Sequence, residues 1–358
     1  MNILLLTYQG GIAGSTQSIF FLADGLAKHG HNVYVGCIEG TLLYNMLEKS
    51  PAVRIHVGMN SKFDVKAIVH INHIVRTKNI DIVNPQSSHD RYLSIFSKMI
   101  FGFDAKIVHT RRQVGEHRKG QISRLWVKYT EGLIAVSNGV KKKMMEYGVP
   151  ESHIEVIHNG TPKEKYAIDC RDKTRELRTR YGLHPGDIVI GCVARYKRQE
   201  QLVKALSYLE QQVTLLFVGI SENETLKELS ARTGGKHRII YTGMIEAEEV
   251  LCHYPLFDIN VLPSVMEGLS QSLLEAMALG VPVLATRAAG NIDLIRDSEN
   301  GLLFDDNDIG ELADKIKRLL NDSELRKRCI ANGKKTALEE FSIEKTVERH
   351  IQYFNSLL

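Results

Sequence analysis

The sequence predicts an α/β fold made of two consecutive Rossmann-like domains, each built on a doubly wound parallel sheet. Short apolar runs alternate with helical patterns along nearly the whole chain, which is typical of strand–helix–strand units. A polar, highly charged stretch at residues 161–180 interrupts this alternation once. The length of 358 residues fits two domains. We therefore expect two domains of similar size that face one another across a cleft.

The first domain is predicted to span residues 1–162 and to begin with a strand at 2–7. A glycine-containing loop follows, and Ser15 or Thr16 is expected to cap the helix after it. A strand at 33–36 then completes a strand–loop–helix–strand unit, the usual beginning of a doubly wound sheet. Further strands are expected at residues 80–84, 106–109, 132–136 and 154–157.

The second domain is predicted to span residues 163–341. The charged stretch supplies the linker and an entering helix, and a second series of apolar runs follows. Strands are expected at residues 188–193, 213–218, 238–241, 259–262 and 283–285. A last helix, at about 342–358, comes after this second sheet is complete, so we expect it to pack back on the first domain.

The charge balance points to an anionic partner for the first domain. The whole chain has 46 Lys and Arg against 42 Asp and Glu, a net charge of +4, but basic residues gather at 106–143. This segment predicts contact with an anionic membrane or a phosphate-rich acceptor, or it is a solvated helix face. Nucleic acid is not expected, because the net charge is modest and no binding module is recognisable.

The five cysteines are scattered, with no pair at the spacing of a zinc site or a redox motif. We expect them to be free, buried thiols in a reducing compartment. The chain begins without the basic region of a signal peptide, and no apolar run approaches the ~18 residues of a membrane span. These features predict a cytoplasmic protein, with peripheral contact at the inner face of the membrane as a further expectation.

The most informative segment is the run from Pro263 to Thr286. A strand ends before it, and a helix is expected from about Gln271 to Leu279. Backbone N–H groups at the start of such a helix can bind phosphate, and a carboxylate inside the helix can accept hydrogen bonds from a ribose diol. Two glutamates at this spacing, taken alone, are more commonly solvated side chains.

Residues 267–286, EGLSQSLLEAMALGVPVLAT, resemble the E-x7-E signature of retaining glycosyltransferases of family 4, the group 1 glycosyl transferases, which have the GT-B fold. Residues 2–35, 136–162 and 288–308 resemble other segments of that family in the same order. The resemblance implies a donor-binding second domain and an acceptor-binding first domain. It also implies that the enzyme takes a nucleotide-diphospho-sugar, UDP- or GDP-linked, as substrate.

The resemblance assigns the donor site residue by residue. Arg195 and Lys197 would hold the diphosphate and stabilise the charge of the leaving group without a metal or cofactor, and Arg198 is an alternative for the second cation. Glu267 would face the donor sugar, and Glu275 would bind the ribose. The backbone of the intervening loop and of the first-domain glycine loop would contact sugar and phosphate, at residues Gly268, Leu269, Ser270, Gly11 and Gly14.

The acceptor side departs from the family pattern. The family often has a histidine after the strand near residue 108, where a strict comparison puts Arg112. His109 and His117 lie nearby, and we favour His109 because it ends a strand. Ser137 would sooner cap the helix after it than contact a substrate.

The resemblance thus implies a metal-independent hexosyltransferase acting on a lipid-linked or phosphorylated saccharide, in bacterial cell-surface polysaccharide, lipopolysaccharide or glycolipid assembly. Three alternatives stay open. The first is a nucleotide-sugar epimerase with the same fold. The second is a non-enzymatic module with this fold that binds carbohydrate or membrane. A nicotinamide-dependent oxidoreductase would use Gly11-x-x-Gly14 as a partial dinucleotide fingerprint, with Glu39 on the ribose.

Overall fold

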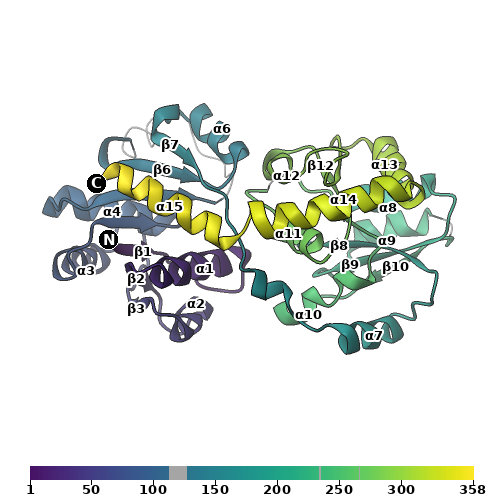
Figure 1. Cartoon of the computed structure of the whole chain (residues 1–358), viewed down its shortest axis with the longest axis horizontal. Helices are drawn as coiled ribbons and strands as arrows, with labels where there is room; N and C mark the ends of the chain where they lie inside the picture. Colours follow the sequence, from purple (N-terminus) through teal and green to yellow (C-terminus); the bar gives the residue numbers. More distant parts are fainter. Residues whose placement is uncertain (113–126, 234, 266) are drawn as a thin grey trace. The chain divides into compact units, whose positions relative to one another are not determined.

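The chain folds into two compact units, Met1–Pro162 with Phe341–Leu358 and Lys163–Glu340. This computed structural model describes residues 1–112, 127–233, 235–265 and 267–358. Each unit contains one parallel sheet with helices on its faces (Figure 1). The predicted α/β class with two doubly wound domains is thereby confirmed.

The described part of the first unit contains a seven-stranded sheet in the order β3-β2-β1-β4-β5-β6-β7. All neighbouring strands run parallel. Strand β3 was not predicted, because apolar and polar residues alternate in its sequence and give no continuous apolar run. It lies half-exposed at the sheet edge. The strands are β1 Asn2–Leu6, β2 Asn32–Cys37, β3 Val53–His56, β4 Ile82–Pro85, β5 Lys106–Arg111, β6 Gly132–Ala135 and β7 Ile154–Val156.

Helices cover both faces of this sheet, so consecutive strand residues are buried on opposite sides. Leu5 and Val108 pack with α1 and α15, whereas Leu4 and Ile107 pack with α3 and α4. The main helices of the first unit are α1 Gly14–Lys28, α2 Leu42–Met46, α3 Val65–Thr77, α4 Ser88–Phe101, α6 Asn138–Glu146 and α15 Ile343–Leu357.

The C-terminal helix α15 belongs to the first unit, as predicted. Its apolar residues Val347 and Phe354 are fully buried in the same core cluster as the first strands. Figure 1 shows α15 in yellow lying along α1. The prediction for the start of α1 was wrong, because the helix begins at Gly14 and its N-cap is Ala13. The Thr16 hydroxyl instead donates back to the loop carbonyl of Gly11, at 2.6 Å.

In the described part of the second unit the sheet has six strands in the order β10-β9-β8-β11-β12-β13. The strands are β8 Ile188–Val193, β9 Val213–Val218, β10 Arg238–Tyr241, β11 Ile259–Leu262, β12 Val283–Thr286 and β13 Leu302–Phe304, of which the three-residue β13 was not expected. The helices are α7 Arg171–Arg180, α8 Glu200–Ala205, α9 Glu224–Ala231, α10 Ala247–Leu251, α11 Gln271–Ala278, α12 Ala289–Leu294, α13 Ile309–Asn321 and α14 Ser323–Lys335. Among the described residues, no helix is both long and apolar enough to cross a bilayer.

Two of the five cysteines form a disulfide, which corrects the prediction of five free thiols. Cys170, before α7, is bonded to Cys252, after α10, across a sequence separation of 82 residues. The linear spacing gave no sign of this pair because tertiary packing brings the ends of α7 and α10 together. The remaining three, Cys37, Cys192 and Cys329, are free and buried as expected.

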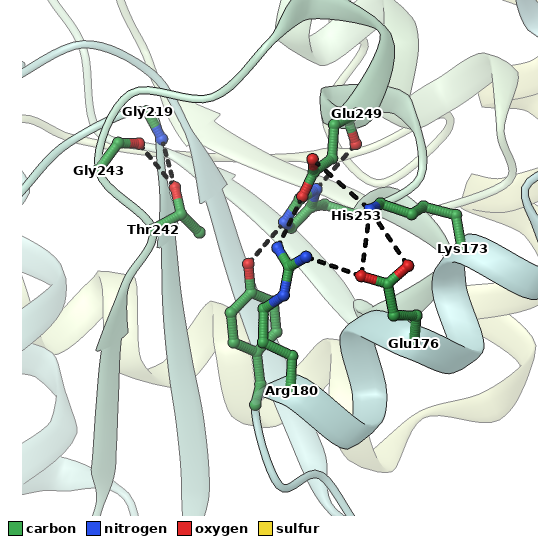
Figure 2. A network of polar contacts seen from close by, with 9 residues as sticks. Lys173, Glu176, Arg180, Gly219, Thr242, Gly243, Glu249 and His253 are labelled. Atoms are coloured by element: carbon green, nitrogen blue, oxygen red, sulfur yellow. Dashed lines mark hydrogen bonds and ion pairs between the residues drawn. The ribbon is translucent and has the colours of Figure 1, made fainter.

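Charged side chains join the same two helices (Figure 2). Arg180 pairs with Glu249 at 3.0 Å, and Glu176 bridges Arg180 and Lys173. Beneath them, His253 lies 2.9 Å from the hydroxyl of Tyr181. The ion pairs are largely solvent-exposed, so each contributes little to stability. The covalent bond is therefore the stronger tie between α7 and α10.

We expect the double variant Cys170→Ser, Cys252→Ser to unfold more easily than the oxidised wild type, by about 2–4 kcal/mol, because the open chain has more conformational freedom when unfolded. Urea unfolding followed by circular dichroism measures the difference. A dithiol reductant should lower the stability of the wild type and leave the double variant unchanged. Equal stability of oxidised and reduced wild type would contradict a disulfide at this position.

Candidate functional site

In the second unit the candidate site lies where the strand order reverses. From β8 the chain proceeds to β9 on one side, whereas β11 is followed by β12 on the other. The loops that leave the carboxyl ends of β8 and β11 therefore start side by side, at residues 194–199 for β8 and at 263–265 and 267–270 for β11. In open parallel sheets, such a reversal is where ligands bind.

An ion pair joins these two loops. Lys197 Nζ lies 2.5 Å from Glu267 Oε1, and the side chain of Glu267 is only 12% exposed. The β8 loop is braced from within, since Gln199 accepts from the Lys197 backbone N–H and donates to the Arg195 carbonyl. A cation and a carboxylate, both predicted from sequence, are thus held in contact at the reversal of the strand order.

Lys197 and Arg198, the two alternatives for the second predicted diphosphate-binding cation, contact different carboxylates. Arg198 has a left-handed backbone with φ of 62° and directs its guanidinium to the carboxylate of Asp306. Gln201 donates to the other oxygen of Asp306 at 3.0 Å. Lys197 therefore faces Glu267, whereas Arg198 pairs with Asp306 in the loop before α13. Arg195 lies exposed on the same loop.

Backbone packing holds the loop that carries Glu267, Gly268 and Leu269. At Gly290, in the first turn of α12, an added Cβ would lie 2.1 Å from the carbonyl oxygen of Gly268, so only glycine fits. The Gly290 N–H donates to the Glu267 carbonyl at 3.2 Å. Ser270 caps α11 by accepting from Leu273 N, which directs the first N–H groups of the helix toward the loop.

Glu275, the second glutamate of the signature, lies inside α11 and is engaged at both carboxylate oxygens. Lys165 Nζ lies 2.6 Å from Oε1, and the Tyr254 hydroxyl donates to Oε2 at 2.8 Å. Lys165 and Glu275 are only 13% and 12% exposed. Burial and the nearby charge of Glu275 raise the pKa of Tyr254 well above its usual range, which keeps its hydroxyl a donor.

Sequence reasoning missed both partners of Glu275. Lys165 lies in the short helix Lys163–Tyr166, inside the stretch interpreted as linker, and Tyr254 belongs to the turn Tyr254–Leu256. Neither residue forms a motif with Glu275, because Lys165 is 110 residues away in the chain. The high density of charged residues around 161–180 was the only signal, and it does not single out Lys165.

In the first unit, the predicted glycines lie in the loop after β1. Gly14 is the first residue of α1. A Cβ added at Gly11 would meet no heavy atom within 4 Å, so the space beside this residue is open. The neighbouring Gly10 is the packing-constrained one, since a Cβ there would lie 2.5 Å from Thr41 Oγ1.

The three acceptor-side candidates occupy different surroundings. His109 is 1% exposed within β5 and shares the sheet face of Ile107, toward α4, where burial and the charge of Arg91 lower its pKa. Ser137 is buried and caps α6 by accepting from Val140 N at 3.2 Å. Arg112 follows β5 at the carboxyl edge of the sheet and is partly exposed.

Part of the predicted basic segment lies outside the described residues. Positions 113–126, which include His117, are among those left out. Of the described part, Lys141 pairs with Glu151, and Lys143 pairs with Glu146.

Two family profiles match the chain in succession. Residues 12–165 match the family described as Glycosyltransferase Family 4. Residues 174–336 match the family described as Glycosyl transferases group 1. One match ends and the other begins close to the division between the two compact units.

Curated relatives are similar over part or all of the chain. The uncharacterized glycosyltransferase MJ1069 of Methanocaldococcus jannaschii is 28% identical over 66% of this chain and 61% of its own length. N-acetyl-alpha-D-glucosaminyl L-malate synthase of Bacillus anthracis is 24% identical over 99% of this chain and 96% of its length. A GDP-mannose-dependent alpha-(1-6)-phosphatidylinositol monomannoside mannosyltransferase of Mycolicibacterium smegmatis is 29% identical over 54% and 53%. The chain thus spans less than two thirds of several of its relatives.

Solved structures share the fold over the whole chain. A glycosyltransferase from Rickettsia africae matches with a TM-score of 0.85 at 22% identity, covering 99% of this chain and 98% of that one. Anabaena Alr3699/HepE in complex with UDP and glucose matches with a TM-score of 0.82 at 20% identity, covering 99% and 100%. These likenesses confirm the expected GT-B fold.

We expect Lys165→Met to destabilise the second unit by about 3–5 kcal/mol, because it leaves the Glu275 carboxylate buried without its cation. Urea unfolding of the full chain measures the loss. Lys163→Met is the matched control: it removes an exposed lysine of the same short helix and should change stability by no more than about 0.5 kcal/mol. Equal effects of the two variants would mean that the Lys165–Glu275 pair is not formed.

Proposed function

Because the chain belongs to the group 1, family 4 glycosyltransferases, we propose that it moves a sugar from a nucleotide-diphospho-sugar to an acceptor hydroxyl with retention of configuration. The observation that carries this proposal is the Lys197–Glu267 pair at the strand reversal of the second unit. The capped start of α11 lies beside it and offers N–H groups to a phosphate.

In the proposed reaction, the bond between the sugar's anomeric carbon and the diphosphate oxygen breaks first. Negative charge develops on the leaving diphosphate, and the cations Arg195 and Lys197 stabilise it electrostatically, with no metal or other cofactor in the proposal. The acceptor oxygen bonds to the anomeric carbon from the face that the diphosphate leaves, and the departing phosphate oxygen takes the acceptor's proton. Glu267 orients the sugar, and Glu275, fixed by Lys165 and Tyr254, binds the ribose.

The proposed donors are UDP- or GDP-linked sugars. The Anabaena structure contains UDP and glucose, and the mycobacterial relative is GDP-mannose-dependent. The proposed acceptor is a lipid-linked or phosphorylated saccharide of cell-surface glycan assembly, bound by the first unit at the cytoplasmic face of the membrane. The acceptor of the mycobacterial relative, a phosphatidylinositol monomannoside, supports this class, as does the basic segment 106–143.

The proposal is tested first with donor alone. We expect UDP- or GDP-sugars, in one of the two nucleotide series, to be slowly hydrolysed and to release the sugar first in the anomeric configuration of the donor, as followed by proton NMR. The matching nucleotide diphosphate should raise the melting temperature, and NADH should not. Release of the inverted anomer would contradict retention. An epimerised donor would favour the epimerase, and stabilisation by NADH alone would favour the oxidoreductase.

We expect Lys197→Ala to lower the turnover number by about 10²–10³-fold, because the charge on the leaving diphosphate loses a cation held in place beforehand. Steady-state kinetics with the donor identified above measures this loss. Lys204→Ala, which removes an exposed lysine of α8, should leave turnover unchanged. If Arg198→Ala proved more damaging than Lys197→Ala, Arg198 would be the second cation.

A further inference from the structure

Arg112 is held at the carboxyl edge of the first sheet by two neutral amides. Its Nε and Nη2 donate to the side-chain oxygen of Gln86, at 3.2 and 2.6 Å. Its Nη1 donates to the side-chain oxygen of Asn159 at 2.6 Å. Gln86 follows β4 and Arg112 follows β5, so the guanidinium lies close to the point between β1 and β4 where this sheet reverses its strand order.

The amides that hold Arg112 are themselves fixed. Gln86 is 4% exposed, and its side-chain nitrogen donates to the amide oxygen of Asn84 and, at 3.4 Å, to Thr110 Oγ1. Asn84 is fully buried and donates to the Val108 carbonyl. This chain of donors leaves the Gln86 oxygen as the acceptor that faces Arg112. The position of the guanidinium is therefore set before any ligand arrives.

The charge of Arg112 is not neutralised within the part of the chain that the structure describes. Its partners among the described residues are the amide oxygens of Gln86 and Asn159, and neither is a carboxylate. His350 of α15 adds no second positive charge, because burial and the charge of Arg112 lower its pKa to about 4 and keep it neutral at pH 7. Burial lowers the pKa of Arg112 to about 10, which leaves it positively charged at pH 7.

Even a partly buried cation without a counter-charge is costly, and arginines with a purely structural role at such positions are normally paired with carboxylates. A guanidinium has five N–H donors in a planar fork, and the two amides use three of them. Two donors stay available on a partly exposed group. A carboxylate or a phosphate is the ligand whose charge and geometry match such a fork.

We propose that Arg112 receives an oxyanion of the acceptor, a carboxylate or a phosphate carried by the sugar, and thereby selects charged over neutral acceptors. This inference rests on the proposed function, because it takes the first unit as the acceptor-binding one. It narrows the proposed acceptor to sugars that carry a phosphate or a carboxylate, and it adds the specificity-determining residue. Gln86 and Asn159 act as positioning residues for the guanidinium.

The test compares three small sugars as probes: glucose 6-phosphate, glucuronate and glucose. Calorimetric titrations use the full chain with UDP or GDP present to occupy the donor site. The wild type should bind at least one charged sugar about tenfold more tightly than glucose, as a charge-assisted hydrogen-bonded fork provides. The phosphate and the carboxylate probe identify the source of the oxyanion. A wild type that binds neither charged sugar better than glucose overturns the proposal.

Variants of Arg112 test whether this residue causes the preference for charged over neutral sugars. Arg112→Gln should reduce it to less than about twofold, and Arg112→Lys, which keeps the charge but loses the fork, should keep part of it. Arg76→Gln is the matched control, since Arg76 also donates to a side-chain amide and a carbonyl but is exposed on α3. An undiminished preference in Arg112→Gln overturns the proposal. If Arg112→Gln does not fold, a full preference in Arg112→Lys overturns it instead.

The same samples separate this inference from the proposed function. Binding of the nucleotide diphosphate is measured in every variant and should not depend on Arg112. A preference for charged sugars without nucleotide binding would support the oxyanion site and contradict the transferase proposal. Nucleotide binding without the preference would leave the transferase proposal standing and reject the oxyanion site.

Discussion

The reversal of strand order in each sheet is the constraint on which both candidate sites depend. Parallel strands end at one edge, and a sheet that winds outward in both directions leaves two loops diverging from neighbouring strand ends. In the second unit these loops carry Lys197 and Glu267. In the first unit the two loops are the glycine loop after β1 and the segment after β4 that begins with Gln86. The chemistry at each edge follows from which side chains these loops present.

The two sites differ in whether their positively charged side chains are paired with carboxylates. In the second unit, Lys197, Lys165 and Arg198 each contact a carboxylate, so each of these three charges is balanced within the unit. The contact with Glu267 sets Lys197 in position without leaving it unpaired. In the first unit, Arg112 is held by amides that fix its direction but not its charge. A paired cation costs less to bury than an unbalanced one, which favours contact with an anion.

The fold could be predicted from the sequence where burial on both faces gives continuous apolar runs. Strands such as β8 and β9 are of this kind. The edge strand β3 and the three-residue β13 give too short or too mixed a pattern. In the candidate site, the signature segment predicted the loop with Glu267 and Gly268 and the helix start near Ser270, because these features depend on local sequence. The partners of Glu275 and the Cys170–Cys252 bond depend on tertiary contacts between distant segments, which linear spacing does not encode.

The sequence also did not predict on which face of the sheet a side chain near a strand end lies. His109 and Arg112 are three residues apart: a strict comparison with the family put Arg112 at the histidine position, whereas His109 was favoured because it was predicted to end the strand. Alternation along β5 places His109 among buried side chains toward α4, whereas Arg112 comes after the last paired residue and reaches the edge. The exact residue at which a strand ends decides this difference, and apolar patterning does not fix that residue.

The return of α15 to the first unit makes the second unit an insertion within the first. Residues 163–340 separate the two segments that share one core, and Val347 and Phe354 fill part of that core from the far side of the insertion. During synthesis, the second unit is complete in sequence before these two side chains exist. The core of the first unit can therefore be completed only after the whole second unit has been synthesised.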